Sequence, residues 1–196
     1  MNQRKEPPQV PLTTEASAKQ RPPTSRLWKQ IKLWVRELII AGMVCLLVVT
    51  FIAQPFKVDG SSMLPNLKSN ERIMANKFVA RFGEIKRGDV VVFWYPFNPS
   101  RTYVKRVIGL PGEMIEIRDG YVYIDGRRLS EPYLQPSYRD NRDFKPVNVK
   151  PAHYYLMGDN REISNDSRYF GQVPKRYILG KVMFIYWPIS EMGIIR

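Results

Sequence analysis

Residues 87–126 read RGDVVVFWYPFNPSRTYVKRVIGLPGEMIEIRDGYVYIDG, in which short runs of Val, Ile, Tyr and Phe alternate with turn residues. Runs of this kind, bounded by Gly, Pro, Asn and Asp, are typical of β-strands. The pattern predicts strands at 90–95, 103–110, 114–117 and 121–124. The dipeptide Asp119-Gly120 favours a two-residue hairpin turn between the last two of them.

The same pattern continues toward the C-terminus, where it predicts further strands at 154–157 and 182–187. Residues 127–152 are polar and contain proline, which indicates an extended loop or a small excursion from the sheet. No apolar pattern of helical period and convincing length follows residue 56. The sequence therefore predicts a mainly β domain over residues 57–196.

The segment before this domain is apolar. Residues 38–56 read LIIAGMVCLLVVTFIAQPF, 19 residues without a charge, and a helix of that length spans roughly 28 Å. We expect residues 28–56 to hold a juxtamembrane segment and a transmembrane helix, with Trp28 and Trp34 near the interface. A buried core helix and a cleaved signal peptide are the alternatives.

The charge ahead of this span predicts its orientation. Residues 1–37 hold eight Lys or Arg against three acids, and such an excess favours the cytoplasmic side of a membrane. We therefore expect a single-pass protein, with residues 1–27 as a disordered basic tail in the cytoplasm and residues 57–196 outside it.

Composition excludes several kinds of site. The 196 residues include 31 Lys or Arg against 18 Asp or Glu, a net charge of +13 that suits nucleic acid or an anionic membrane surface. The expected topology favours the lipid bilayer over nucleic acid. One cysteine and one histidine exclude a disulfide framework and disfavour a zinc site. They also leave His153 as the only base for a His-dependent triad.

Two clusters suggest a serine and its base. In Val58-Asp-Gly-Ser-Ser-Met-Leu-Pro-Asn-Leu67 a serine beside glycine can expose its hydroxyl, but a serine needs a base to become a nucleophile. In the strand at 103–110, Lys105 and Arg106 must point to opposite faces. A lysine buried on the core face has a lowered pKa and can act as a general base. A Ser-rich turn and a surface lysine are the plain alternatives.

A third cluster, residues 158–174, reads GDNREISNDSRYFGQVP. Asp159, Arg161, Asp166 and Arg168 are suited to a network of acid–arginine pairs that pins a loop. Ser164 could add hydrogen bonds within it. A charged surface loop is the alternative.

Taken in order behind an apolar span, the motifs GSSMLPNL, RGDVVVF, YVKRVIGLPG and GDNREISNDSRYFGQVP resemble bacterial type I signal peptidase, a membrane-bound Ser/Lys protease family. The resemblance covers residues 28–196 and is closest to the single-anchor members. It implies antiparallel β-sheets with a small coiled barrel and a site on the outer face of the bacterial cell membrane. It also implies a reaction that removes signal peptides from exported preproteins, which carry small residues before the cut. The resemblance implies that this reaction needs no metal or cofactor.

The resemblance also implies roles for individual residues. Ser62 would be the nucleophile and one oxyanion donor through its backbone N–H, Lys105 the general base, and Ser164 a hydroxyl that orients the lysine. The supporting loop would be held by Asp159, Arg161, Asp166 and Arg168. The pockets for the small substrate residues would be lined by Val58, Met63, Tyr103 and Val104.

The chain departs from the family pattern at three positions. Gly60 stands where some members have a serine whose hydroxyl helps to bind the oxyanion, which leaves the second donor open, with Ser61 as a conceivable substitute. Asn66 stands where threonine is common, and Ile163 where asparagine is common.

Other protein classes would use the same residues differently. A cytoplasmic self-cleaving Ser/Lys regulator would need a DNA-binding domain, which the sequence does not suggest. A His-dependent relative would need His153 as its base. A membrane-tethered β-domain that only binds peptides or envelope components, or an inactivated homologue, would not depend on Ser62 and Lys105.

Overall fold

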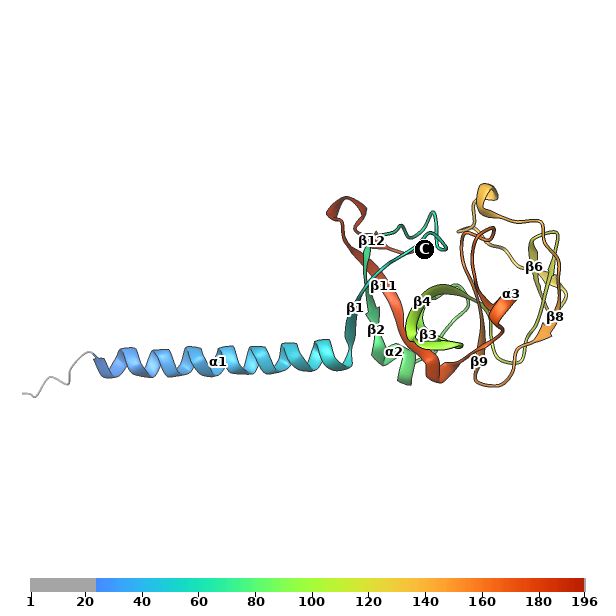
Figure 1. Ribbon diagram of the computed structural model, residues 1–196. Coiled ribbons are helices and arrows are strands. Elements are labelled where there is room, and N and C mark those ends of the chain that lie inside the picture. The colour runs from blue at the N-terminus through green and yellow to red at the C-terminus, as the bar shows by residue number, and fades with distance from the viewer. Residues whose placement is uncertain (1–23, 196) are drawn as a thin grey trace, which may run out of the picture. The chain divides into compact units, whose positions relative to one another are not determined.

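The structure, a computed structural model, describes residues 24–195 (Figure 1). The chain divides into two compact units, one up to Met43 and one from Val44 onward. Helix α1, Thr24–Phe51, begins in the first unit and ends in the second. Of the tail predicted at residues 1–27, residues 1–23 lie outside the described residues. Residues 24–27 belong to α1 and are therefore helical, contrary to the prediction.

The uncharged run 38–56 is not one helix, contrary to the prediction. The α1 ladder ends with the Ile52 N–H donating to Val48 O across 2.9 Å, and strand β1 begins at Ala53. Pro55 explains this end, because proline has no N–H to continue the ladder and disfavours helical backbone in the residue before it. Among the residues that the structure describes, no helix is long and apolar enough to span a membrane.

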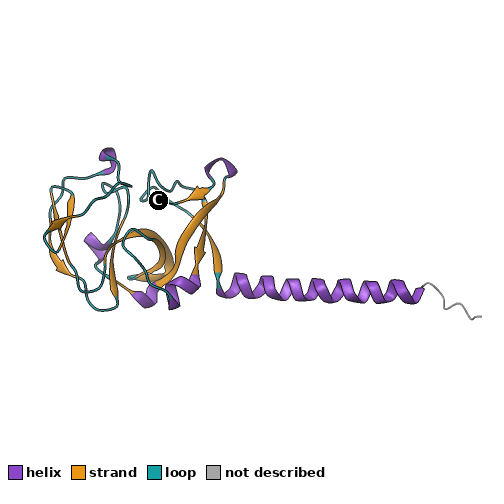
Figure 2. Ribbon diagram, turned by 180° about the vertical axis from the view of Figure 1, so that it is seen from behind, coloured by secondary structure: helices purple, strands orange, loops and turns teal. Residues whose placement is uncertain are grey.

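The larger sheet has eight antiparallel strands in the order β1-β2-β11-β3-β4-β9-β10, with β12 paired to β11. Figure 2 shows the strands of the chain in orange. Its strands are β1 Ala53–Lys57, β2 Arg72–Asn76, β3 Val90–Tyr95, β4 Asn98–Gly109, β9 His153–Met157, β10 Val173–Pro174, β11 Ile178–Trp187 and β12 Gly193–Ile194. The predicted strands at 90–95, 103–110, 154–157 and 182–187 all lie in it. The sequence analysis missed four strands of this sheet, namely β1, β2, β10 and β12, of which β1 and β2 pair with each other.

The smaller sheet has four strands in the order β7-β6-β5-β8. Its strands are β5 Met114–Arg118, β6 Tyr121–Ile124, β7 Arg127–Arg128 and β8 Phe144–Asn148. Asp119 and Gly120 both have positive φ, 49° and 72°, as a two-residue turn of type I′ requires, so the predicted hairpin is confirmed. Residues 127–152 supply β7 and β8, which makes this segment part of a sheet.

Short helices, which sequence periodicity did not indicate, connect the strands. They are α2 Lys77–Phe82 and α3 Ser167–Phe170, with 3₁₀ turns η1 Pro136–Tyr138, η2 Lys175–Tyr177 and η3 Ile189–Glu191. Each α-helix is too short to show a period, and its cap is the better signal: the Asn76 side chain accepts from Val79 N, and the Asp166 side chain from Arg168 N. The prediction of a mainly β, antiparallel domain is confirmed.

The apolar cores lie against both sheets. One cluster packs Phe93, Val107 and Leu156 of the larger sheet. A second packs Ile73 and Val92 around Met63 and Leu67, which belong to the segment after β1. Packing Met63 and Leu67 into this core fixes the path of the residues between them and β1, and Ser62 is among those residues.

Candidate active site

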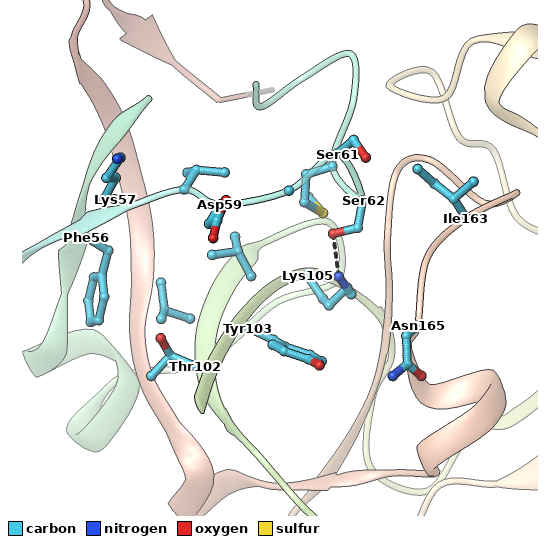
Figure 3. A pocket seen from close by; sticks show the side chains of 15 residues that line it. Phe56, Lys57, Asp59, Ser61, Ser62, Thr102, Tyr103, Lys105, Ile163 and Asn165 are labelled. Atoms are coloured by element: carbon cyan, nitrogen blue, oxygen red, sulfur yellow. Dashed lines mark hydrogen bonds between the residues drawn. The ribbon is translucent and has the colours of Figure 1, made fainter. Parts of the chain in front are cut away.

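Ser62 and Lys105 meet across the fold. Ser62 lies in the segment after β1, whereas Lys105 lies on β4 opposite Val91 of β3. Lys105 Nζ donates to Ser62 Oγ across 2.6 Å (Figure 3). A hydroxyl and an amine in direct hydrogen-bond contact have the geometry that proton transfer from a serine requires.

The surroundings of Lys105 favour the neutral amine. The side chain is almost fully buried, and burial lowers the pKa of Lys105 to about 8, against the opposing charges of Asp166 and Asp159, which raise it. Strand alternation places Lys105 and Arg106 on opposite faces of β4, as the sequence predicts. An amine with a pKa near 8 is neutral in a sizeable fraction of molecules near neutral pH, so it can accept a proton.

The backbone around Ser62 is held from the opposite loop. Asn160 N donates to Ser62 O across 3.0 Å, and Asn160 Nδ2 donates to Ser61 O across 3.3 Å. Within the part of the chain that the structure describes, the Ser62 N–H donates no hydrogen bond, so it is available to a ligand.

Gly158 allows this close approach. A Cβ at position 158 would lie 2.5 Å from Ser62 O and even closer to Ser164 Oγ. We expect Gly158→Ala to displace Ser62 and to lower kcat/KM for peptide cleavage by about 100-fold or more, because a shift of roughly 1 Å in a catalytic group has that effect. Gly193→Ala, whose Cβ would meet nothing within 4 Å, is the matched control. Equal activity of the two variants would mean that the loop yields without moving Ser62.

Ser164 differs from the expectation. Its hydroxyl is buried beside Gly158, but Oγ has no hydrogen-bond partner among residues 24–195, so the predicted bond to Lys105 is not formed. The Lys105 amine is instead directed to Ser62. A buried hydroxyl without a partner costs free energy, and Ser164 does not itself line the pocket beside Ser62.

The four acid and arginine residues of the third cluster do form ion pairs, but mostly with partners outside it. Within the cluster, Asp166 pairs with Arg168 at 2.8 Å, and it also accepts from Gly158 N at 3.0 Å. Asp159 pairs with Arg106 of β4 at 2.7 Å. These contacts tie the loop to the strand that carries Lys105.

Two acids that the sequence analysis missed complete this network. Glu131 forms a buried ion pair with Arg161, and Asp140 pairs with Arg168 at 2.6 Å. Both acids come from the stretch 127–152, far along the chain from the loop. Sequence spacing carries no signal for such pairs, because the supporting loop and its partners meet only in the folded chain.

A pocket of about 380 Å³ opens beside Ser62 and Lys105 (Figure 3). The four predicted substrate-binding residues, Val58, Met63, Tyr103 and Val104, all line it. Further lining residues that the sequence analysis did not name as substrate-binding include Phe56, Thr102, Ile163 and Asn165. The Ser61 hydroxyl is directed away from Lys105. The arrangement combines a serine hydroxyl, a lysine amine and a cleft that has both polar and apolar lining residues.

His153 lies elsewhere. It is the first residue of β9, its Nδ1 lies 2.8 Å from Pro151 O, and it does not line the pocket beside Ser62. The structure therefore does not bring the histidine to the serine.

Known proteins resemble this chain over most of its length. A family model described as signal peptidase, peptidase S26, matches residues 31–187. A signal peptidase I of Bacillus licheniformis is 39% identical over 168 residues, 81% of this chain and 90% of that protein. One of Bacillus amyloliquefaciens is 38% identical over 189 residues, 92% and 94% of the two chains. The crystal structure of a signal peptidase I from Enterococcus faecalis, 35% identical, aligns with a TM-score of 0.45 over 50% of this chain and 96% of that one.

Proposed function

The chain belongs to the signal peptidase S26 family, and we propose that it removes signal peptides from exported preproteins with Ser62 as nucleophile and Lys105 as general base. Membership makes it a peptide-bond hydrolase. The observation that carries the proposed chemistry is the 2.6 Å contact between Lys105 Nζ and Ser62 Oγ at the edge of the pocket.

The reaction follows from this contact. Ser62 Oγ attacks the carbonyl carbon of the scissile bond while its proton passes to Lys105 Nζ. The tetrahedral intermediate then collapses, the C–N bond breaks, and Lys105 returns the proton to the leaving amine. Lys105 Nζ then deprotonates a water molecule, which attacks the carbonyl carbon of the ester. The bond from that carbon to Ser62 Oγ breaks, and Ser62 Oγ takes the proton back from Lys105 Nζ.

The oxyanion of the intermediate needs hydrogen-bond donors. We assign the first to the Ser62 N–H, which donates to no group among residues 24–195. Each such donor is worth roughly 3–4 kcal/mol of transition-state stabilisation. Gly60 offers no side-chain donor, and the outward direction of the Ser61 hydroxyl disfavours it as the second.

Ser164 is assigned as a positioning residue. Its partnerless hydroxyl adjoins Gly158, next to the Ser62 carbonyl. Once Ser62 is acylated, its Oγ carries no hydrogen and can no longer donate a hydrogen bond to Lys105 Nζ. The Ser164 hydroxyl would then hold the Lys105 amine in place while water hydrolyses the acyl-enzyme.

The substrate would lie as an extended strand along the edge of the pocket, with small side chains facing Val58, Met63, Tyr103 and Val104. Val58 and Met63 are only 5% and 2% exposed, so the surrounding packing restricts the movement of this wall of the pocket. Such a wall would favour Ala over larger residues before the cut.

The membrane location is also part of the proposal. The supporting features are the uncharged residues 38–51 within α1 and the basic excess before them. We propose one pass through the bacterial cell membrane, with the N-terminus in the cytoplasm and the β-domain on the outer side. Protease added to intact spheroplasts should then degrade the β-domain and spare an N-terminal tag, and the reverse pattern would reject this orientation.

The pH profile tests the base. Lys105 must be neutral to accept a proton, and its pKa is lowered to about 8. For the full chain in detergent acting on a preprotein with Ala-x-Ala before the cut, kcat/KM should rise about tenfold per pH unit below pH 8 and level off above it. A midpoint near 6.5 would indicate a histidine base instead. No cleavage of varied preproteins at any pH would favour the tethered binding module.

A further inference from the structure

A second cavity lies away from the catalytic pocket. It has a volume of about 530 Å³ between α2, the start of β11 and the turn η2, and it shares no residue with the pocket beside Ser62. Figure 1 shows α2 beside β11. Its size is that of a small-molecule site, and the proposed peptidase reaction makes no use of it.

The polar part of this cavity is entirely basic. Four cationic side chains line it, and so does the single histidine: Lys77, Arg81, Lys175, Arg176 and His153. No carboxylate is among the lining residues. No ion pair among the residues that the structure describes involves Arg81, Lys175 or Arg176. The like charges of Arg81, Lys175 and Arg176 repel one another, and a bound anion relieves that repulsion.

The remaining wall is apolar. Ala80 and Ile178 are buried at 2% and 6% exposure, and they line the cavity with Leu179 and Trp94. The Trp94 ring packs edge-on against Tyr177 with centroids 6.4 Å apart. A free inorganic anion would leave this surface unused, whereas an anion joined to a hydrocarbon chain would cover it.

Helix α2 adds a second apolar feature beside the cavity. Lys77 and Arg81 are four residues apart and face the cavity together, and Phe78 and Phe82 form a second such pair. These two rings lie 5.1 Å apart and are 54% and 74% exposed. Exposed aromatic rings beside cations are typical of helices that lie at a lipid interface. The Lys77 N–H also donates to Ile52 O, directly after α1.

From these observations we propose that the cavity binds one anionic phospholipid, with the phosphate held by Arg81, Lys175 and Arg176 and the upper acyl chain against Trp94, Ile178 and Leu179. Arginine and lysine are the usual partners of phosphate oxygens. The anion chemistry is independent of the peptidase reaction; only the lipid as its source rests on the proposed membrane location.

The test is isothermal titration of the full chain in detergent with three probes: dioctanoyl phosphatidylglycerol, dioctanoyl phosphatidylcholine and inorganic phosphate. We expect saturable binding of phosphatidylglycerol, at least tenfold tighter than that of either other probe. In Lys175→Gln/Arg176→Gln the affinity should fall about 30-fold, since each cation near such a headgroup contributes roughly 1 kcal/mol. Arg81→Gln, on a different element, should weaken binding about fivefold.

The matched control is Lys86→Gln/Arg101→Gln, which removes the same charge from two exposed positions that line neither cavity. Its affinity should stay within threefold of wild type. An equal loss in both double variants would overturn the site, because it would show binding by net charge alone. Absence of saturable binding by any probe would overturn it as well. Phosphate binding as tight as that of the lipid would reject the lipid and leave a free-anion site. Preprotein cleavage, measured in the same samples, reports separately on the peptidase proposal.

Discussion

Ser62→Ala should abolish preprotein cleavage, with a fall in kcat of about 10⁴-fold or more, and Lys105→Met should do the same. Members of a nucleophile–base pair act as a unit, so loss of either one removes nearly the whole effect. Ser62 Oγ is bonded to Lys105 Nζ at 2.6 Å, and no histidine lines the pocket to replace the lysine. The matched controls, at exposed positions, are Ser190→Ala and Lys86→Met.

Stability separates this loss from misfolding. The pKa of Lys105 is lowered to about 8 in the folded chain from an ordinary 10.5. The unfolded chain therefore binds more protons between these values, so the wild type gains stability as pH rises from about 8 toward 10.5. Below pH 8 the buried charge costs on the order of 3 kcal/mol. Lys105→Met should thus unfold at a higher temperature than wild type at pH 7.

The advantage of Lys105→Met should shrink as pH rises above 8, because wild-type Lys105 then loses its charge. An inactive Lys105→Met that melts below wild type at pH 7 would point to packing damage and not to loss of a base. Full activity of Ser62→Ala would reject the dyad outright.

Asp159→Ala should be the most destabilising single change in the supporting network. Asp159 forms two hydrogen bonds with Arg106, at 2.8 and 2.7 Å, and the two side chains are 0% and 2% exposed. Removal of the carboxylate takes away both of these charge-assisted hydrogen bonds, while the guanidinium stays in the protein interior. Breaking such a buried pair costs about 3–5 kcal/mol of unfolding free energy.

Urea unfolding of the full chain in detergent measures this loss. Glu191→Ala is the control, because it breaks the Lys68–Glu191 pair, whose side chains are 51% and 41% exposed, and such pairs contribute about 0–1 kcal/mol. Arg106→Met/Asp159→Leu should recover much of the stability, since this double change removes both buried charges together. If Asp159→Ala and Glu191→Ala proved equal, the Arg106 charge would have to be solvated in the folded chain.

Local signals in the sequence indicated most of the β-structure. Short runs of Val, Ile and Tyr between turn residues indicated β3 to β6, and Asp119-Gly120 indicated the turn between β5 and β6. Both signals depend only on residues that are neighbours in the sequence. The boundary at Phe51 was missed, since residues 52–56 are as apolar as a helix would be and only the position of Pro55 indicated the strand. The α2 helix was missed because six residues are too few to show a period.

The sequence predicted those residues of the candidate site that lie within recognisable motifs. The motifs indicated Ser62 and Lys105 as candidate residues. Their contact could not be derived from the sequence, because they lie 43 positions apart and meet only when β1 to β4 have folded. Glu131 and Asp140 lie in a stretch with no motif, and their partners Arg161 and Arg168 are reached only in three dimensions. The expected Ser164 bond is not formed, since Ser164 Oγ has no hydrogen-bond partner among residues 24–195 and Lys105 Nζ donates to Ser62 Oγ.

Lys105 and Arg106 are neighbours on β4 but have different partners. Lys105 donates to Ser62 in the pocket, whereas Arg106 pairs with Asp159 of the supporting loop. Their separation depends on the register of β4 against β3, where Val91 faces Lys105 and Tyr95 faces Asn98 across a two-residue connection. An insertion of one residue there that slipped the pairing would turn every side chain of β4 to the other face. The Lys105 amine and the Arg106 guanidinium would exchange faces of the strand. A one-residue change in the length of this connection is therefore compatible with the enzyme only where the loop or a bulge absorbs it, and the ladder already has a register shift between Trp94 and Tyr95.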